Sequence, residues 1–176
     1  MKTVLCAIAI LAGVGLTQAG AADEVYRSNF DQELDQWQGR PGLGEWRKPE
    51  LALTSNDARK SGENVLQVET DGRIGTGIEL KPIVPLEKGK TYVLTYYVRT
   101  AAALPVTFRL IDIDLKGIPT NEAKWNRAPE SNGDWVEVVY EFTATSTPIG
   151  VEIAAGSDKY EPTTLAIADL TVKEAR

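Results

Sequence analysis

The side chains that most often carry out enzyme chemistry are nearly missing from this sequence. It contains no histidine, and Cys6, its single cysteine, lies in an apolar run near the start. Nucleophilic arrangements with histidine and His-ligated zinc are therefore excluded. Four carboxylates on expected strands, Asp112, Asp114, Glu137 and Glu141, could be proposed for glycoside hydrolysis. That reaction needs two carboxyl groups facing each other across a cleft, whereas acidic residues two apart on a strand are ordinary, so we expect no catalysis.

Three other side chains are better suited to binding than to reaction. Tyr97 and Arg99 share one parity of an expected strand, and Arg109 lies on the outward parity of the next one. Sugars offer apolar faces to aromatic rings and hydroxyl groups to bidentate polar side chains. If the two strands are adjacent, all three side chains lie on one outward sheet face and form the floor of a shallow cleft. The alternative is that Tyr97 only covers the sheet while the arginines pair with Glu137 or Glu141.

Trp125 and Trp46 lie in expected loops at the rim of the fold. Trp125 is in the middle of the long polar connection 116–133, and Trp46 follows the glycine-rich loop 39–44. Loops of this kind often carry function. Both rings are candidate stacking platforms for a ligand, and the alternative for each is a lid over the core.

The elements that must position these residues are all strands. In 89–100, Tyr92, Leu94, Tyr96 and Val98 alternate with outward positions, which is typical of a half-buried strand. Further strands are expected at 25–30, 51–54, 65–69, 78–86, 105–114, 135–144, 149–153 and 163–172, with turn signals between them. No window shows helical periodicity. The pattern predicts an all-β sandwich of two antiparallel sheets.

Two details of these strands carry their own expectations. Pro82 and Pro85 place the strand at 78–86 on a sheet edge, because proline cannot donate a ladder hydrogen bond. Ile111 and Ile113 are apolar on the parity opposite to Leu110, which predicts a bulge or twist near that residue.

The chain is expected to be one secreted domain behind a targeting segment. Residues 1–22 have a charged start, a short apolar run and small residues before a cleavage site near Ala21 or Ala22, as in a signal peptide. The domain 23–176 would be soluble, periplasmic or extracellular, and monomeric. Without Lys2, 18 basic side chains remain against 25 acidic ones, a net charge of −7. This charge disfavours nucleic acid and anionic membranes but not neutral ligands.

Several separated motifs occur in an order that resembles a known family. They are NFD at 29–31, Trp37, KSGENVLQV at 60–68, GKTYVLTYYVR at 89–99, GDWVEVVYEF at 133–142 and LAIADLTV at 165–172. This order is similar to the carbohydrate-binding modules of the family four, nine and twenty-two type. The resemblance implies a galactose-binding-like jelly roll that binds a poly- or oligosaccharide and performs no chemistry.

The same resemblance implies a structural calcium ion near the meeting of the first and last strands. Carried over by position, Asp31 and Asp169 would be carboxylate ligands, and backbone carbonyls of the 60–64 turn would complete the shell. Calcium prefers six to eight oxygen ligands, so the donors are suitable. The alternative is that these carboxylates are solvated or cap turns.

The sequence thus predicts a secreted, non-catalytic β-sandwich that binds carbohydrate. The alternative, from another class, is a structural or adhesive envelope protein that uses the same sandwich to contact a protein partner.

Overall fold

The computed structural model describes residues 23–30, 34, 36–55, 64–112, 124–156 and 162–176 of the chain. These residues form eleven strands. In chain order they are β1 (Glu24–Ser28), β2 (Trp37–Arg40), β3 (Leu51–Thr54), β4 (Val65–Thr70), β5 (Thr76–Val84), β6 (Thr91–Thr100), β7 (Val106–Asp112), β8 (Asn126–Arg127), β9 (Val136–Thr143), β10 (Ile149–Ala155) and β11 (Thr163–Glu174).

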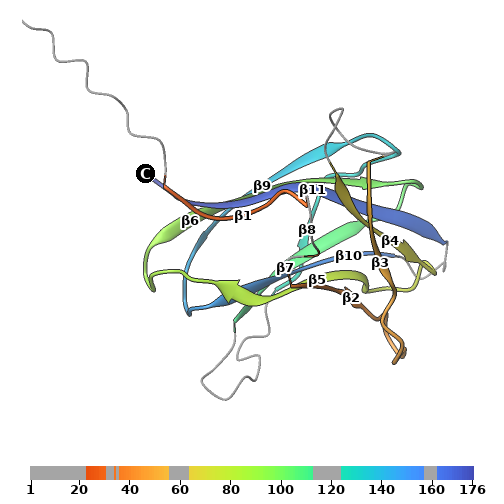
Figure 1. Cartoon of the computed structure of the whole chain (residues 1–176), viewed down its shortest axis with the longest axis horizontal. Helices are drawn as coiled ribbons and strands as arrows, with labels where there is room; N and C mark the ends of the chain where they lie inside the picture. Colours follow the sequence, from red (N-terminus) through yellow and green to blue (C-terminus); the bar gives the residue numbers. More distant parts are fainter. Residues whose placement is uncertain (1–22, 31–33, 35, 56–63, 113–123, 157–161) are drawn as a thin grey trace, which may run out of the picture.

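Two antiparallel sheets pack face to face, as the sequence predicts. Sheet A has the order β3-β4-β11-β6-β9, with β1 paired to β11, and sheet B has the order β2-β5-β10-β7-β8. In Figure 1 the strands β1, β6, β9 and β11 of sheet A lie in the upper layer, and β2, β5, β7 and β10 of sheet B lie in the lower one. The all-β, two-sheet prediction is confirmed, and no helix occurs within the described ranges.

Strand β6 shows how the pattern of residues produces the core. Its burial alternates at every position, with Tyr92, Leu94, Tyr96 and Val98 each at most 2% exposed. Side chains of one parity enter the space between the sheets because successive residues point to opposite faces. They meet apolar side chains of sheet B, among them Ile78, Leu80, Phe108, Val151 and Ile153.

The longest strand, β11, changes partners part-way along its length. Its first half pairs with β4, its second half pairs with β1, and β6 lies along its other side. A register shift between Ala168 and Thr171 marks the change, and Asp169 there has a φ of 49°. This bulge is where the first and last strands meet.

Trp37 is an anchor of the core. It is 4% exposed, its ring centroid lies 5.9 Å from that of Phe30, and its Nε1 donates to Ser28 Oγ at 3.2 Å. A buried indole N–H needs such an acceptor.

Two expectations about individual strands are wrong. Strand β5 is not an edge, because it lies between β2 and β10. However, β2 pairs only with Gly77–Leu80, and the pairing of β5 with β10 shifts register between Leu80 and Val84, the interval that contains Pro82. The bulge expected near Leu110 is absent, because the pairing of β7 with β10 is uninterrupted there; Ile113 lies outside the described residues. Instead, Ile111 lies on the outer face and is still only 6% exposed.

The targeting segment 1–22 lies outside the described residues. None of the described residues belongs to a helix long and apolar enough to cross a membrane.

Candidate functional site

The outer face of sheet B has a buried carboxylate at its centre. Every residue of the central strand β10 is buried, including those that point away from the core. The outward ones are Gly150, Glu152 and Ala154, and Glu152 is 6% exposed. Antiparallel sheets usually place solvated polar residues on such a face. A buried carboxylate needs charged or hydrogen-bonding partners, so its neighbours decide what this face can do.

Two arginines share this carboxylate. Arg40, at the end of β2, donates from Nε to Glu152 Oε2 at 2.9 Å, and Arg109 of β7 donates from Nε to the same oxygen at 2.6 Å. Their side chains are 21% and 27% exposed, against 8% for Glu152. Arg40 also donates from Nη1 to the carbonyl oxygen of Gly75. The three side chains thus form one ion cluster over the middle of sheet B.

Trp125, just before β8, completes the cluster. Its ring centroid lies 4.7 Å from Arg109 Cζ and 5.1 Å from Arg40 Cζ. Guanidinium groups at such distances are attracted to the indole ring. Trp125 is half-buried. We call Arg40, Glu152, Arg109 and Trp125 the Arg–Glu site.

Two glycines allow Arg40 to reach the centre of the sheet. Gly77 lies opposite Arg40 on β5, and a Cβ there would be 2.1 Å from the carbonyl oxygen of Ile153. Gly75 has a φ of +86°, and a Cβ on it would be 2.7 Å from Arg40 Nη1. Glycine at both positions lets the chains approach closely and leaves room for the guanidinium group.

The outer face of sheet A carries the other predicted binding pair. Tyr97 points away from the core, as expected, and its hydroxyl donates to Glu137 Oε1 at 2.7 Å. Arg99 Cζ lies 5.0 Å from the ring centroid of Trp135. A hollow of about 240 Å³ beside Arg99 is lined by Ala101, Gly133, Thr164 and Ala166.

The expectation that Arg109 shares this face is wrong. Tyr97 and Arg99 lie on β6 in sheet A, and Arg109 lies on β7 in sheet B. The chain crosses between the sheets after Thr100, so strands that are consecutive in sequence are not adjacent in space. The two arginines therefore belong to opposite surfaces, and Arg109 pairs with Glu152 rather than with Glu137 or Glu141.

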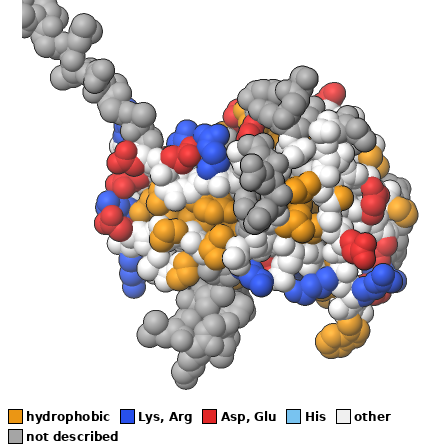
Figure 2. Space-filling model, viewed as in Figure 1, with side chains coloured by type: hydrophobic (Ala, Val, Ile, Leu, Met, Phe, Trp, Pro, Cys, Tyr) orange, Lys and Arg blue, Asp and Glu red, His pale blue; other side chains and the backbone are white. Residues whose placement is uncertain are grey.

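Trp46 is not a lid over the core. It is 97% exposed on the segment between β2 and β3, with Leu43 and Ile74 also exposed, at 81% and 53%. The backbone N–H of Leu43 donates to the carbonyl of Ile74 at 3.0 Å. In Figure 2 an apolar group protrudes at the lower right, where this segment lies in Figure 1.

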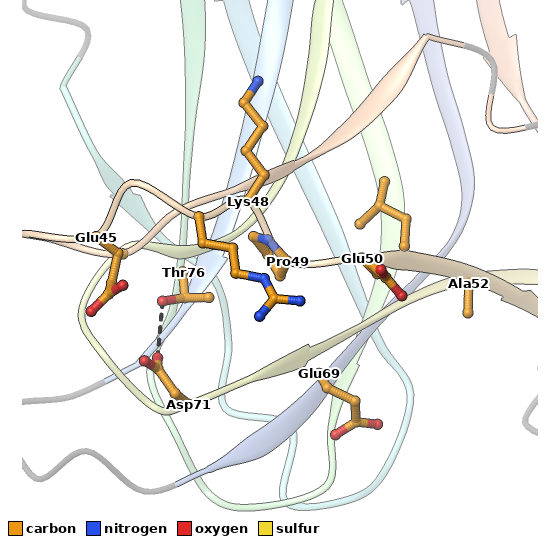
Figure 3. A pocket seen from close by; sticks show the side chains of 11 residues that line it. Glu45, Lys48, Pro49, Glu50, Ala52, Glu69, Asp71 and Thr76 are labelled. Carbon is orange, nitrogen blue, oxygen red and sulfur yellow. Dashed lines mark hydrogen bonds between the residues drawn. The ribbon is translucent and has the colours of Figure 1, made fainter.

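A larger hollow of about 560 Å³ lies under the same segment. Figure 3 shows Glu45, Lys48 and Glu50 on one side of it and Glu69 and Asp71 on the other, with Thr76 hydrogen-bonded to Asp71. The side chains that line it are charged, aliphatic or small, and no aromatic ring is among them. This hollow is therefore less suited to stacking than the Arg–Glu site, despite its volume.

Of the two implied calcium-binding carboxylates, the structure describes Asp169. Asp169 lies at the bulge of β11 where β1 meets it, and its negative charge helps to raise the pKa of Arg27, although the hydrogen bond to Glu24 contributes more. Asp31 and the 60–64 turn, apart from Asn64, lie outside the described residues. No group of three acidic residues that could hold a metal occurs in the described part of the chain.

The carboxylates considered for hydrolysis do not form one site. Glu137 and Glu141 lie on the outer face of sheet A, whereas Asp112 ends β7 in sheet B. Asp114 lies outside the described residues.

Comparison with known families agrees with this architecture. Residues 22–162 match the family described as "Carbohydrate binding domain". The chain belongs to this family. The family predicted from the order of the motifs is thereby confirmed. A comparison with the curated proteins finds no match.

Solved structures of other carbohydrate-binding modules have the same fold as this carbohydrate-binding domain. The CBM22-1 xylan-binding domain of Paenibacillus barcinonensis Xyn10C has a TM-score of 0.65 at 16% identity, covering 89% of this chain and 97% of that one. The CBM22-1 and GH10 modules of Clostridium thermocellum xylanase 10B, complexed with xylohexaose, give 0.67 at 17% identity over 87% and 29%. The N-terminal cellulose-binding domain of Cellulomonas fimi β-1,4-glucanase C gives 0.54 at 20% identity over 88% and 99%.

Three residues of these two faces of the carbohydrate-binding domain were not among the predicted binding residues: Arg40, Glu152 and Trp135. Arg40 falls in a glycine-rich stretch that was expected to be a loop. Glu152 had a detectable signal, because it is the single charged residue in the apolar run IGVEIAA. A carboxylate there must be buried and therefore partnered.

Proposed function

We propose that this protein binds a poly- or oligosaccharide on the outer face of sheet B, at the Arg–Glu site. The observation that carries the proposal is the ion cluster of Arg40, Glu152 and Arg109 held against the ring of Trp125. A sugar presents an apolar face that can stack on an indole and hydroxyl groups that can pair with guanidinium and carboxylate groups. The ion pairs fix these groups before the ligand arrives, which lowers the cost of ordering them on binding.

The chemistry of the site supports binding without reaction. Both glycosidase mechanisms need two carboxyl groups about 5 to 9.5 Å apart, one of them able to give up a proton. Glu152 instead accepts hydrogen bonds from two arginines, and the described residues of the Arg–Glu site include no second carboxyl group. We propose that the protein is non-catalytic, secreted and monomeric.

Binding should be tested by calorimetric titration of the purified protein with soluble xylan, mixed-linkage glucan and mannan, and by depletion on insoluble polysaccharides. At least one glycan is expected to bind. Arg109→Ala and Trp125→Ala should abolish that binding, because they remove a hydrogen-bonding fork and the stacking ring. Lys173→Ala, a change of charge on sheet A, is the matched control. Failure to bind any of the polysaccharides would overturn the proposal.

Tyr97 and Arg99 remain a second candidate surface for the same ligand class. The ring of Trp135 under Arg99 and the neighbouring hollow favour it. If this face binds the glycan, Trp135→Ala should remove binding and Trp125→Ala should not.

A protein partner is the alternative function. It is favoured by the exposed apolar side chains of Leu43, Trp46 and Ile74, since such groups often mark contact sites. Retention of one envelope protein in a pull-down, lost in Trp46→Ala and accompanied by no glycan binding, would replace the carbohydrate proposal.

A further inference from the structure

We infer that the Arg–Glu site selects glycans that carry a carboxylate, that is, uronic acid residues. This inference rests on the proposed function and adds to it the chemical class of the sugar. It follows from the charges, the unused hydrogen-bond donors and the distribution of basic residues on the two faces.

The Arg–Glu site holds more positive than negative charge. Two guanidinium groups share one oxygen, Glu152 Oε2, and both use their Nε atoms for it. Among the described residues, the two Nη atoms of Arg109 make no hydrogen bond, and only Nη1 of Arg40 does. The two Nη atoms of Arg109 therefore have no acceptor in the described part of the chain, and the side chain is 27% exposed.

The rest of the outer face of sheet B does not cancel this charge. Its described basic side chains are Arg40, Lys81, Arg109 and Arg127, and its acidic ones are Glu79 and Glu152. Glu130 pairs with Arg127 at 2.8 Å, which still leaves one positive charge in excess. Figure 2 shows basic side chains along the lower rim, where sheet B lies in Figure 1.

Sheet A has the opposite balance. Its outer face carries Arg27, Arg99 and Lys173 against Glu24, Glu69, Glu137 and Glu141. The whole protein is acidic, with a net charge of −6. A positive excess on one face of an acidic protein is what recognition of an anionic ligand requires.

A sugar carboxylate fits the free donors of the Arg–Glu site better than a hydroxyl group does. Guanidinium and carboxylate groups form two parallel charge-assisted hydrogen bonds, which are shorter and stronger than neutral ones. Partial burial strengthens the attraction relative to an exposed pair. The ring of Trp125 beside the arginines can hold the apolar face of the same sugar unit.

The test uses matched pairs of ligands that differ only in charge. A xylo-oligosaccharide with a glucuronic acid branch and an oligogalacturonide are each titrated into the full protein beside their carboxyl-reduced forms. In at least one pair the acidic form should bind about tenfold more tightly. This preference should weaken as salt is raised, because salt screens the attraction.

Variants test whether the preference for acidic glycans arises at the Arg–Glu site. Arg109→Gln should abolish it, Arg109→Lys should retain part of it because the charge remains without the fork, and Lys173→Gln on the opposite face should leave it unchanged. If the acidic and reduced forms bind equally, or if only neutral glycans bind, the inference is overturned and the proposed function survives. If no glycan of any kind binds, the proposed function fails and the inference fails with it.

Discussion

At the scale of single residues, Glu152 is the group on which the Arg–Glu site depends. Glu152→Gln keeps the shape of the side chain and removes the charge that two partly buried arginines share. Because those arginines keep some contact with solvent, we expect the free energy of unfolding to fall by about 1–3 kcal/mol rather than by the full cost of a buried unpaired charge. Urea denaturation measures this, and calorimetry should show weaker binding of neutral glycans, because the arginines lose the group that fixes them.

The matched control for Glu152→Gln is Glu141→Gln. Glu141 is exposed on the outer face of sheet A, where surface substitutions usually change stability by less than about 0.5 kcal/mol. Equal effects of the two variants on stability and binding would show that the ion cluster contributes nothing beyond an ordinary surface pair.

A second residue-scale prediction concerns Tyr96, whose hydroxyl is buried without a hydrogen-bond partner among the described residues. Burial raises the pKa of this phenol well above its usual value, so the group stays neutral. Its ring packs edge-on against Phe108 at 5.9 Å, and Tyr96→Phe keeps that contact while removing the unsatisfied oxygen. We expect the free energy of unfolding to rise by about 0.5–1.5 kcal/mol.

Thermal and urea denaturation check this prediction, with Tyr92→Phe as the control. The Tyr92 hydroxyl accepts a hydrogen bond from the backbone N–H of Glu87 at 2.9 Å, so losing it should lower stability. A fall in stability for Tyr96→Phe as well would mean that its hydroxyl has a partner.

The sequence predicts the direction of single side chains well and their partners poorly. Alternation along 91–100 is enough to send Tyr97 outward and Tyr96 inward, because parity is a local property of a strand. Whether Arg109 meets Tyr97 or Glu152 depends on which strands are neighbours. The packing of the whole chain decides which strands are neighbours, and no local sequence pattern indicates it.

At the scale of elements, the strands themselves were largely predictable and their order was not. The expected strands at 65–69, 135–144 and 163–172 appear as β4, β9 and β11 with small changes at the ends. The edge position expected for β5 was wrong because a short strand, β2, pairs with its first half. The apolar Ile111 suggested a bulge, but Ile111 lies on the outer face of sheet B and is buried there without one.

The pairing of β5 with β10 yields a prediction at this scale. A Cβ at Gly77 would lie 2.1 Å from the carbonyl oxygen of Ile153, which belongs to the backbone and has little freedom to move. Gly77→Ala should therefore push the two strands apart and lower the free energy of unfolding by about 1–3 kcal/mol. It should also weaken glycan binding, because Glu152 lies on the displaced strand.

Gly89→Ala is the control for Gly77→Ala, measured by the same urea denaturation. A Cβ at Gly89 meets nothing within 4 Å, so it costs only the strain of a φ of +89°, about 1 kcal/mol, and should not affect binding. If Gly77→Ala binds glycan as tightly as Gly89→Ala does, the spacing of β5 and β10 does not position the site.

At the scale of the whole molecule, the sandwich presents two outer faces that differ in charge and in partners. Sheet B concentrates arginines around one carboxylate, and sheet A carries Tyr97, Arg99 and Trp135 among more acidic residues. The core separates the two outer faces, so a side chain replaced on one face does not contact the side chains of the other. Variants on opposite faces should therefore act additively on stability, since distant sites usually do.

The implied calcium ion is also a prediction about the whole molecule, because its site would join the first and last strands of the fold. Asp169 lies where β1 and β11 meet, at a bulge with a positive φ. An ion that binds only the folded chain stabilises it, by about 2.7 kcal/mol at a hundred times its dissociation constant. Chelation should then lower the melting temperature by several degrees, and added calcium should restore it. Asp169→Asn should melt at the same temperature with and without chelator; if the unaltered protein does so too, Asp31 and Asp169 are not calcium ligands.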